Sequence, residues 1–279
     1  MIVVTGATGR LGGRVVRRLT NTPLRLLVRD ASRAPAGHEV AVATYDDGEA
    51  VRRALTGAGT VLMVSAAETP GRVAEHIAFV DAAAAAGIGH LVYISFAGAS
   101  PTATFTLARD HWATEEHIRE SGLPFTFLRD SLYADFLPFM VGDDGVIRGP
   151  AGNGRAAFVA QDDIADAAAA ILNDPTGHAG HTYTLTGPES LTMTEAAAAL
   201  TAAGHPARFH NETIEEAYES RRPYNAPDWQ LDAWVSTYTA IAAGELAEVT
   251  TDIPTLTGHP ATSLATLLGR PTRTGTDRK

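Results

Sequence analysis

Three glycines stand at regular spacing near the beginning of the chain, in a setting where they could hold phosphate. Gly6, Gly9 and Gly12 form a G-x-x-G-x-x-G pattern that follows an apolar run at residues 2–4 and precedes a segment of helical periodicity. Between a strand and a helix, one glycine permits a tight turn, one lets the backbone approach a pyrophosphate, and one lets the helix pack closely on the strand. The amino end of that helix faces the phosphate charge. The pattern therefore predicts a dinucleotide-binding site.

The residues after the second expected strand bear on which dinucleotide binds. Arg29 stands at the end of that strand, Asp30 follows it, and Arg33 lies one turn further. At this position an acidic side chain binds the ribose 2′-hydroxyl of NAD(H), whereas an arginine accommodates the 2′-phosphate of NADP(H). A guanidinium can also stack on adenine while it bonds to phosphate. Arg29 therefore favours NADP(H), and Asp30 leaves NAD(H) as the second option.

A shortage of lysine restricts the catalytic chemistry. Lys279 is the only lysine, and the other 21 basic residues are arginines. A Schiff base, a P-loop lysine and the Tyr-x-x-x-Lys pair of ordinary short-chain dehydrogenases are therefore excluded. Ser95 stands where those enzymes carry their serine, but no tyrosine or lysine lies between Ser95 and Glu120. Any proton relay must use other residues.

His111 is the predicted proton donor. Ala108, His111, Glu115 and Ile118 follow a helical stripe, which would turn His111 inward, with Glu115 one turn further on to orient it. Hydride transfer to a carbonyl leaves charge on an oxygen that must be protonated, and histidine has a pKa suited to a general acid. Two alternatives stay open: His111 is an ordinary helix histidine, or solvent protonates the product.

Apolar and aromatic residues after the sixth expected strand could enclose a substrate. Leu132 and Tyr133 follow the end of that strand, where a nicotinamide ring would lie, and they are candidates for its wall. Two further groups have helical spacing and could cap a flat aromatic substrate or form ordinary core. They are Phe136, Phe139 and Met140, and Trp229, Trp234 and Tyr238.

The elements that must position these residues alternate along the first half of the chain. Short apolar, β-branched runs predict strands over residues 2–5, 24–29, 39–43, 60–65, 90–95 and 124–129. Helical patterns lie between them over residues 11–19, 48–55, 72–86 and 106–121. Strand–helix–strand units with almost continuously apolar strands predict an α/β fold, a Rossmann-like doubly wound parallel sheet with helices on both faces. Ligands of such a sheet bind beyond the carboxyl ends of its strands.

The second half of the chain is less regular. Glycine- and proline-rich turns flank a short expected strand over residues 146–148, and further strands are predicted over 157–160 and 182–185, with a helix over 162–172. Thr192 and Glu195 form a capping box that begins a helix to about residue 203, and the remainder is predicted to be helical. We expect an NAD(P)-binding Rossmann domain over residues 1–155. Residues 156–279 would supply returning sheet elements and a smaller, mostly helical substrate lobe.

Composition excludes several classes of protein. The chain has 279 residues and a formal net charge of −10, which disfavours nucleic-acid binding. It contains no cysteine, so disulfides and thiol chemistry are excluded and a reducing cytoplasm is the expected location. Its apolar runs are too short to span a bilayer, and Met1 leads into a strand rather than a signal peptide. His178 and His181 have no sulfur ligands nearby, so no metal site is predicted.

Several segments carry a resemblance to a known family. They are residues 5–12 (TGATGRLG), 27–30 (LVRD), 45–47 (YDD), 92–95 (VYIS) and 122–129 (GLPFTFLR). On these motifs the chain resembles the NmrA-like atypical short-chain dehydrogenases/reductases, and within them most strongly the type 2 NAD(P)H:quinone oxidoreductases. The likeness runs over nearly the whole chain, through residues 149–154 (GPAGNG) to 258–264 (GHPATSL).

The resemblance implies where cofactor and substrate bind. It implies that Thr8, Gly9, Arg10, Leu11 and Gly12 hold the phosphates, that Arg29 binds the 2′-phosphate, that Asp46 lies beside the adenine, and that Ser65, Ala66 and Ala67 line the path after the fourth strand. Gly6 of the glycine pattern and Arg33 after the second strand are further cofactor-binding candidates from their positions. The predicted catalytic residues are His111, which stands where members of the family often carry lysine, together with Tyr133 and Ser95 from their places at the strand ends.

The predicted function is NADPH-preferring reduction of a quinone or another conjugated or aromatic carbonyl by direct hydride transfer, without flavin or metal. A homodimer is a further expectation. Two alternatives use the same scaffold. One is a redox-sensing regulator like NmrA, which binds the dinucleotide without turnover, and the missing Tyr and Lys favour it. The other is a reductase of ketones or imines in secondary metabolism. Fold alone cannot separate them, because chemistry is set by the site.

Overall fold

A seven-stranded sheet forms the centre of the protein. The computed structural model describes residues 1–20 and 22–269. The strands are β1 (Ile2–Thr5), β2 (Leu24–Val28), β3 (Glu39–Val42), β4 (Thr60–Met63), β5 (His90–Phe96), β6 (Phe125–Asp130) and β9 (Thr182–Leu185), in the order β3-β2-β1-β4-β5-β6-β9. Every neighbouring pair is parallel. The strands predicted for this sheet are all present, with ends shifted by no more than two residues.

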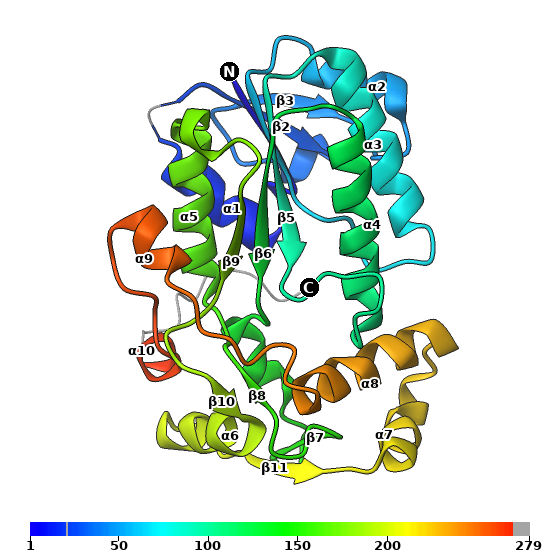
Figure 1. The fold of residues 1–279 in the computed structure, drawn as a ribbon, viewed down its shortest axis with the longest axis vertical. Coiled ribbons are helices and arrows are strands. Elements are labelled where there is room, and N and C mark those ends of the chain that lie inside the picture. The colour runs from blue at the N-terminus through cyan, green and yellow to red at the C-terminus, as the bar shows by residue number, and fades with distance from the viewer. Residues whose placement is uncertain (21, 270–279) are drawn as a thin grey trace.

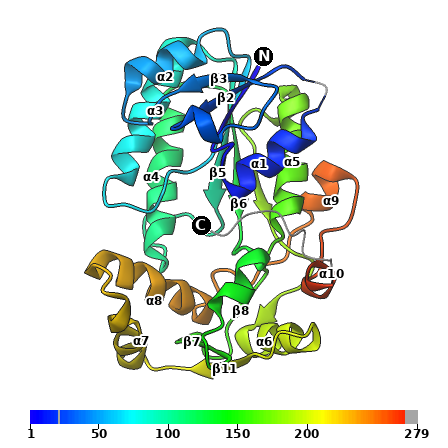
Figure 2. The ribbon, with the colours of Figure 1, turned by 180° about the vertical axis from the view of Figure 1, so that it is seen from behind.

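Helices cover both faces of the sheet (Figures 1 and 2). On one face lie α1 (Arg10–Arg18) and α5 (Gln161–Asn173), and on the other lie α2 (Gly48–Leu55), α3 (Arg72–Ala86) and α4 (Thr106–Glu120). Alternate strand residues face opposite sides, so Val4 packs in one core with Val15 of α1, whereas Val3 packs in the other with Phe79 of α3. The predicted doubly wound, Rossmann-like α/β fold is confirmed.

The strand order determines where ligands can bind. From the central β1, the chain passes first to β2 and β3 on one side and then to β4, β5 and β6 on the other. At this reversal the loops after β1 and β4 leave in opposite directions and open a crevice at the carboxyl edge of the sheet. The glycine-rich residues follow β1, so the fold places them at the crevice.

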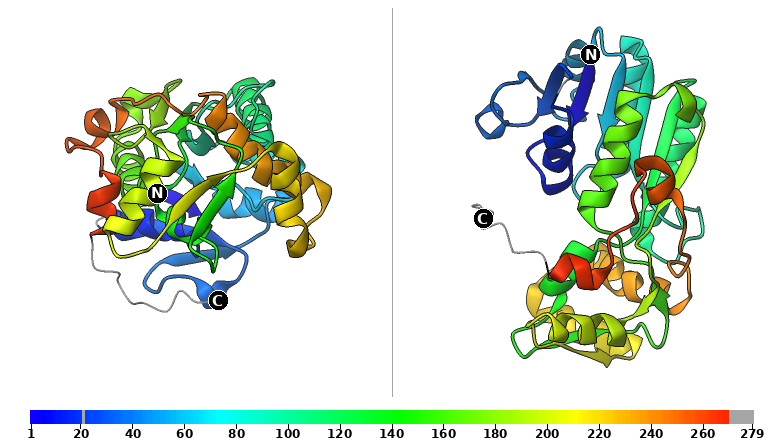
Figure 3. Two further views of the ribbon diagram at one scale, coloured as in Figure 1. Left: turned by 90° about the horizontal axis from the view of Figure 1, so that it is seen from below. Right: turned by 90° about the vertical axis from the view of Figure 1, so that its left-hand side faces the viewer.

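A second lobe lies beyond the carboxyl ends of the strands (Figure 3). It contains the parallel pair β7 (Val146–Gly149) and β11 (Arg208–Asn211) and the antiparallel pair β8 (Arg155–Ala156) and β10 (Leu191–Thr192). Its helices are α6 (Met193–Ala202), α7 (Ile214–Arg221), α8 (Asp228–Ala242) and α10 (Leu264–Leu268), while α9 (Asp252–Thr257) packs beside α5. Short 3-10 helices are η1 (Ala31–Arg33), η2 (Ala134–Met140), η3 (Thr176–His178) and η4 (Arg222–Tyr224).

The two lobes exchange segments of chain. β7 precedes residue 155 yet pairs with β11, and α5 and β9 follow residue 155 yet belong to the layers of the central sheet. The boundary at residue 155 stays a prediction. The capping box of α6 is confirmed, since Thr192 Oγ1 accepts from Glu195 N at 3.1 Å and Glu195 Oε2 accepts from Thr192 N at 2.8 Å.

Two predicted elements of the second half are wrong. Residues 157–160 form no strand, because their backbone pairs with loop segments: Ala157 N donates to Leu246 O, and Val159 N donates to Leu132 O. Residues 208–211 form β11 where helix was expected. Three of those four residues are exposed, so they lack the apolar alternation that indicates a strand.

Residues 1–20 and 22–269 contain neither a membrane-spanning helix nor a group of metal-ligating side chains. No helix there has the length and apolar content needed to cross a membrane. In the same part, no three His, Asp or Glu side chains lie together in a way that could hold a metal ion.

Candidate active site

The glycine-rich loop is held by two close approaches. Gly6 has a φ of +63°, and a Cβ there would lie 2.9 Å from Val64 Cβ. A Cβ on Gly12 would lie 2.3 Å from Gly6 O, closer than real Cβ contacts allow. Only glycine therefore lets the first turn of α1 pack on this loop. No side chain caps the amino end of α1, where Gly9 is the N-cap residue.

The loop forms part of a cavity of about 320 Å³, called here the glycine-loop cavity. Ten of the twelve residues predicted to bind the cofactor line it: Gly6, Thr8, Gly9, Arg10, Leu11, Gly12, Arg29, Ser65, Ala66 and Ala67. They come from the loops after β1, β2 and β4, which the strand order brings together. Tyr45, Thr69 and Glu75 line the same cavity and were not predicted from the sequence.

The charged residues after β2 have different environments. Arg29 is exposed and lines the glycine-loop cavity. Asp30 accepts hydrogen bonds from Ser32 N at 2.9 Å and Ser32 Oγ at 2.7 Å, which lower the pKa of its carboxyl and occupy it as the cap of η1. Arg33 and Asp46 are exposed and do not line the cavity, so their cofactor-binding roles stay predictions.

Buried hydrogen bonds fix the loop after β4. Tyr45 Oη donates to Val64 O at 2.6 Å, and Thr5 Oγ1 accepts from Val64 N at 2.9 Å. Ala66 N donates to His76 Nε2 at 2.9 Å, and His76 Nδ1 lies 2.8 Å from Thr114 Oγ1. Burial, aided by the charge of Arg72, lowers the pKa of His76 to about 3, so its ring is neutral and Nε2 can accept.

A second cavity of about 380 Å³, the central cavity, adjoins the first, and Ser65 lines both. It lies where β5 and β6 end and is walled mainly by apolar and aromatic side chains. The three predicted catalytic residues, Ser95, His111 and Tyr133, all line it, as does Leu132. The two cavities therefore lie side by side, with Ser65 between the glycine-rich loop and these residues.

His111 is buried and both of its ring nitrogens have partners. Arg72 Nη2 donates to Nε2 at 2.9 Å, and Nδ1 lies 2.9 Å from Tyr93 Oη. Burial, followed by the charge of Arg72, lowers the pKa of His111 well below 6.5, so the ring is neutral. Because Nε2 accepts from a guanidinium, the one ring proton is on Nδ1 and faces Tyr93. Proton donation by His111 to a substrate, as predicted, does not fit this arrangement.

Glu115 does not orient His111, contrary to the prediction. Its carboxylate is fully buried and accepts from Arg129 Nε at 2.8 Å and Nη2 at 2.6 Å, and from Arg119 Nη2 at 3.2 Å. Ser95 Oγ donates to Glu115 Oε1 at 2.6 Å. Ser95 therefore completes the environment of a buried ion pair, and its hydroxyl proton is already in use.

Tyr133 and Asp130 form a second buried pair at the end of β6. Tyr133 Oη donates to Asp130 Oδ2 at 3.0 Å. Burial raises the pKa of the Asp130 carboxyl well above its usual range, and burial together with Asp130 raises the pKa of the Tyr133 hydroxyl. Tyr133 is thus a neutral phenol, and its ring stacks on Phe136 with centroids 6.0 Å apart. This places Tyr133 in the wall of the central cavity.

Some residues of these two cavities have buried polar atoms without a hydrogen-bond partner. Thr69 Oγ1 of the glycine-loop cavity, and Arg72 Nε and Ser131 Oγ of the central cavity, are buried without a hydrogen-bond partner. Buried polar atoms are normally paired, and these three belong to residues that line the two cavities. Together with the glycine cradle and the uncapped end of α1, they fit a bound dinucleotide and its substrate.

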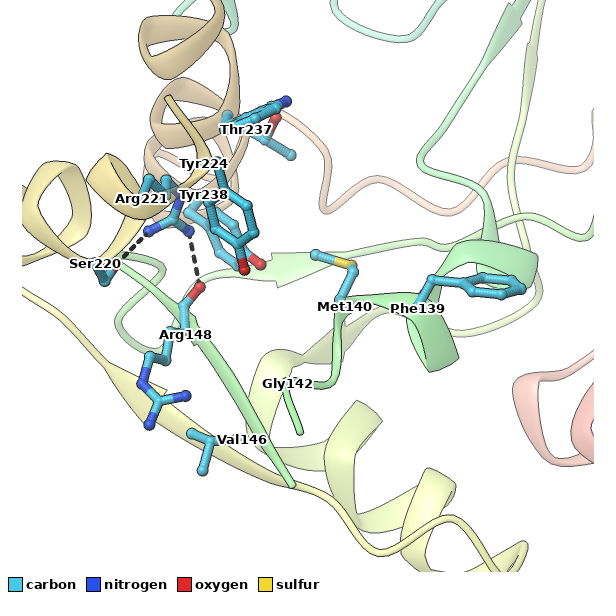
Figure 4. Close-up of a pocket in the computed structure, with 11 residues that line it drawn as sticks. Phe139, Met140, Gly142, Val146, Arg148, Ser220, Arg221, Tyr224, Thr237 and Tyr238 are labelled. Carbon is cyan, nitrogen blue, oxygen red and sulfur yellow. Dashed lines mark hydrogen bonds between the residues drawn. The ribbon is translucent and has the colours of Figure 1, made fainter. Parts of the chain in front are cut away.

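A third cavity of about 600 Å³, the outer cavity, lies in the second lobe (Figure 4). Met140 and Thr237 line both it and the central cavity. Of the two predicted aromatic groups, Phe139, Met140, Trp234 and Tyr238 line the outer cavity and Phe136 lines the central one. Trp229 lines neither of these two cavities. The guanidinium of Arg221 covers the ring of Tyr238 at 5.3 Å.

Comparison with known proteins identifies the family. The sequence model of the NmrA-like family matches residues 1–226, and the chain belongs to this family. Quinone oxidoreductase 2 of Escherichia coli is 32% identical over 278 residues, 95% of this chain and 96% of that protein. NAD(P)H azoreductase of Xenophilus azovorans is 32% identical over 275 residues, again 95% and 96% of the two chains.

Solved structures agree with the sequence relatives. The E. coli quinone oxidoreductase complexed with NADPH superposes with a TM-score of 0.88 at 31% identity and covers 96% of this chain and 98% of that one. Triphenylmethane reductase from Citrobacter sp. complexed with NADP(H) gives a TM-score of 0.85 at 30% identity, with 96% and 99% covered. The predicted family, NAD(P)H cofactor and oxidoreductase class are confirmed.

The close approach at Gly12 can be tested by adding one methyl group. Gly12→Ala should weaken NADPH binding at least about tenfold, because its Cβ would displace the glycine-rich loop or α1. Gly48→Ala is the control, since a Cβ there meets nothing within 4 Å. Isothermal titration measures the dissociation constants, and thermal unfolding confirms that both variants are folded. Unchanged affinity in Gly12→Ala would contradict the role of this contact.

The neutral ring of His76 predicts a pH dependence of stability. Its folded-state pKa of about 3 lies below the unfolded value of 6.5. The contribution of His76 to the free energy of unfolding is therefore complete above pH 6.5 and is lost as the pH falls toward 3. The free energy of unfolding should fall by about 1.4 kcal/mol per pH unit for this group. Urea unfolding between pH 4.5 and 7.5 should show a shallower slope in His76→Gln, which keeps an acceptor for Ala66 N. The exposed control His205→Gln should keep the wild-type slope, and equal slopes in all three proteins would contradict the prediction.

Proposed function

We propose that this protein reduces quinones, or other conjugated and aromatic carbonyl compounds, by direct hydride transfer from NADPH. One observation carries the proposal: the glycine-loop cavity adjoins, at Ser65, a central cavity walled mainly by apolar and aromatic side chains. A dinucleotide whose phosphates lie at the glycine loop would then extend toward the ends of β5 and β6. Bound there, NADPH would supply a hydride to a flat acceptor in the central cavity.

The proposed cofactor contacts follow the cavity lining. The amide groups at the amino end of α1 and residues 8–12 would bind the pyrophosphate, and residues 65–67 would border the chain of the cofactor toward the nicotinamide. Arg29 would bind the 2′-phosphate. Asp30 is occupied by Ser32 and does not line the cavity, which supports the preference for NADPH over NADH.

The residues of the central cavity would exclude water and orient the acceptor. Tyr133 and Phe136 present a stacked aromatic wall, and Ser131 Oγ is a polar atom without a partner. The outer cavity would accept the distal part of a larger acceptor past Met140 and Thr237. Ser95 would act indirectly, through the buried Glu115.

Wild-type protein should oxidise NADPH in the presence of at least one acceptor from a panel of quinones and aromatic carbonyl compounds. Absorbance of NADPH at saturating cofactor measures the rate. Tight NADP+ binding without turnover of any acceptor would overturn the proposal and favour the redox-sensing regulator. Turnover restricted to isolated ketones or imines would favour the secondary-metabolism reductase.

Arg29→Ala should separate the two cofactors. Loss of a charge-assisted contact to phosphate should raise the Michaelis constant for NADPH about tenfold to a hundredfold, with much less effect on NADH. Arg53→Ala is the matched control, because Arg53 is also exposed, belongs to α2 and does not line the cavity. Equal effects of Arg29→Ala on both cofactors would show that Arg29 does not bind the 2′-phosphate.

The predicted cytoplasmic location and homodimer complete the proposal. The location rests on the absence of cysteine from the sequence. Sedimentation of the purified protein tests the dimer directly.

A further inference from the structure

Arg72 is a buried cation without a close counter-ion. Its side chain, at the first residue of α3, is 5% exposed. Nη2 donates to His111, Nη1 lies 3.9 Å from Asp110 Oδ2, and Nε has no partner. A distance of 3.9 Å is too long for a hydrogen bond. A guanidinium has five N–H donors in a rigid plane, so Arg72 has capacity left for another ligand.

The surroundings of Arg72 include the central cavity. Arg72 lines that cavity together with His111, Ser131 and Tyr133. Of the carboxyl groups around this cavity, Glu115 is already paired with Arg129 and Arg119, Asp130 accepts from Tyr133, and Glu68 is exposed. Burying a charge is costly unless it is paired, and Arg72 is paired only at long range with Asp110. An anionic ligand in the central cavity would complete its environment.

We propose that Arg72 binds the substrate oxygen on which negative charge accumulates during reduction. This inference rests on the proposed function and adds to it the group that stabilises the product anion. His111 is a positioning residue: its neutral Nε2 accepts from Nη2 and fixes the plane of the guanidinium. The histidine at the family's lysine position then serves to hold a cation, where proton donation was expected.

The reaction balances with this assignment. The quinone takes up a hydride, one hydrogen with two electrons, from NADPH, which becomes NADP+. A new bond to hydrogen forms on the quinone, and its other oxygen becomes an anion that Arg72 binds. Water supplies the single proton that completes the hydroquinone. Fixed donors at a developing oxyanion are among the largest catalytic contributions that enzymes make.

A cationic acceptor provides the contrast. A triphenylmethane dye cation takes up a hydride at its central carbon and becomes neutral, so no oxyanion develops. Arg72 gives that reaction no assistance, and its charge opposes binding of the cation. Removing Arg72 should therefore change the preference between the two acceptors, whereas general damage to the fold would slow both alike.

The test compares Arg72→Met and Arg72→Lys with Arg53→Met, which removes an exposed arginine of α2. With 2-methyl-1,4-naphthoquinone as acceptor, Arg72→Met should lose about 100-fold in kcat. Arg72→Lys, which keeps the charge without the planar donors, should lose less. With malachite green as acceptor, neither variant should be slower than wild type, and Arg53→Met should match wild type with both acceptors. Equal losses with the two acceptors, or no loss with the quinone, would overturn the proposal.

A binding measurement separates this inference from the proposed function. The anion of 2-hydroxy-1,4-naphthoquinone should bind wild-type protein at least about tenfold more tightly than Arg72→Met, measured by isothermal titration without cofactor. If wild type oxidises NADPH with neither acceptor, the proposed function fails, and this affinity difference still decides whether Arg72 binds oxyanions. Equal affinities would overturn its role. Thermal unfolding identifies any variant that fails to fold, and Arg72→Lys then carries the comparison.

His111 has its own test. His111→Leu removes the acceptor for Arg72 and should lower the ratio of quinone to dye turnover, whereas His111→Gln offers an amide oxygen in its place and should preserve that ratio. A merely structural role would lower both rates and leave the ratio unchanged, which would contradict the positioning role.

Discussion

The site depends on one close contact, between the turn at Gly6 and the first turn of α1 at Gly12. A side chain on Gly12 would begin 2.3 Å from Gly6 O, so the helix reaches the loop only because that atom is missing. This approach directs the uncapped amino end of α1 into the glycine-loop cavity. Hydrogen bonds of Thr5 and Tyr45 with the backbone of Val64 then hold the loop after β4 at the same carboxyl edge of the sheet. The shape of the glycine-loop cavity, and its border with the central cavity at Ser65, depend on this arrangement.

Polar side chains buried between α3 and α4 also support the site. His76 holds the backbone of Ala66, and Arg72 is held by His111. Both histidines have pKa values lowered by burial, so neither adds a positive charge beside Arg72. Glu115 is neutralised by its own arginines. Arg72 is therefore a cation balanced only at long range by Asp110, and it lines the central cavity.

The sequence predicted the parts of the fold that follow local rules. Apolar strands, the glycine spacing and the capping box at Thr192 each act over a few residues, so they can be recognised without tertiary information. β11 could not be recognised from the sequence, because its four residues are mostly exposed and gain strand structure only by pairing with β7. The family resemblance added the residues of the cavity lining.

The chemistry of the central cavity was harder to predict. Arg72 at the start of a helix looks like an ordinary solvated residue in the sequence, and its burial depends on α4 packing over it. The helical stripe placed His111 inward correctly. It could not show that Arg72 and Tyr93, 39 and 18 residues away in the chain, occupy both ring nitrogens. Long-range partners decide protonation, and the sequence pattern does not contain them.

Replacing a Tyr-Lys relay with an arginine also restricts which acceptors suit the site. A guanidinium keeps its proton at any pH a protein meets, so Arg72 can hold negative charge but cannot deliver a proton. Tyr133, with its hydroxyl bonded to Asp130 and its pKa raised, is a poor acid. Protonation is then left to water, which can approach where Phe136 is 44% exposed.

A quinol anion, whose charge is delocalised over a ring, persists until water protonates it. The alkoxide of an isolated ketone is far more basic and needs a proton as it forms. The arrangement therefore favours conjugated acceptors over simple ketones, through proton supply as well as through shape.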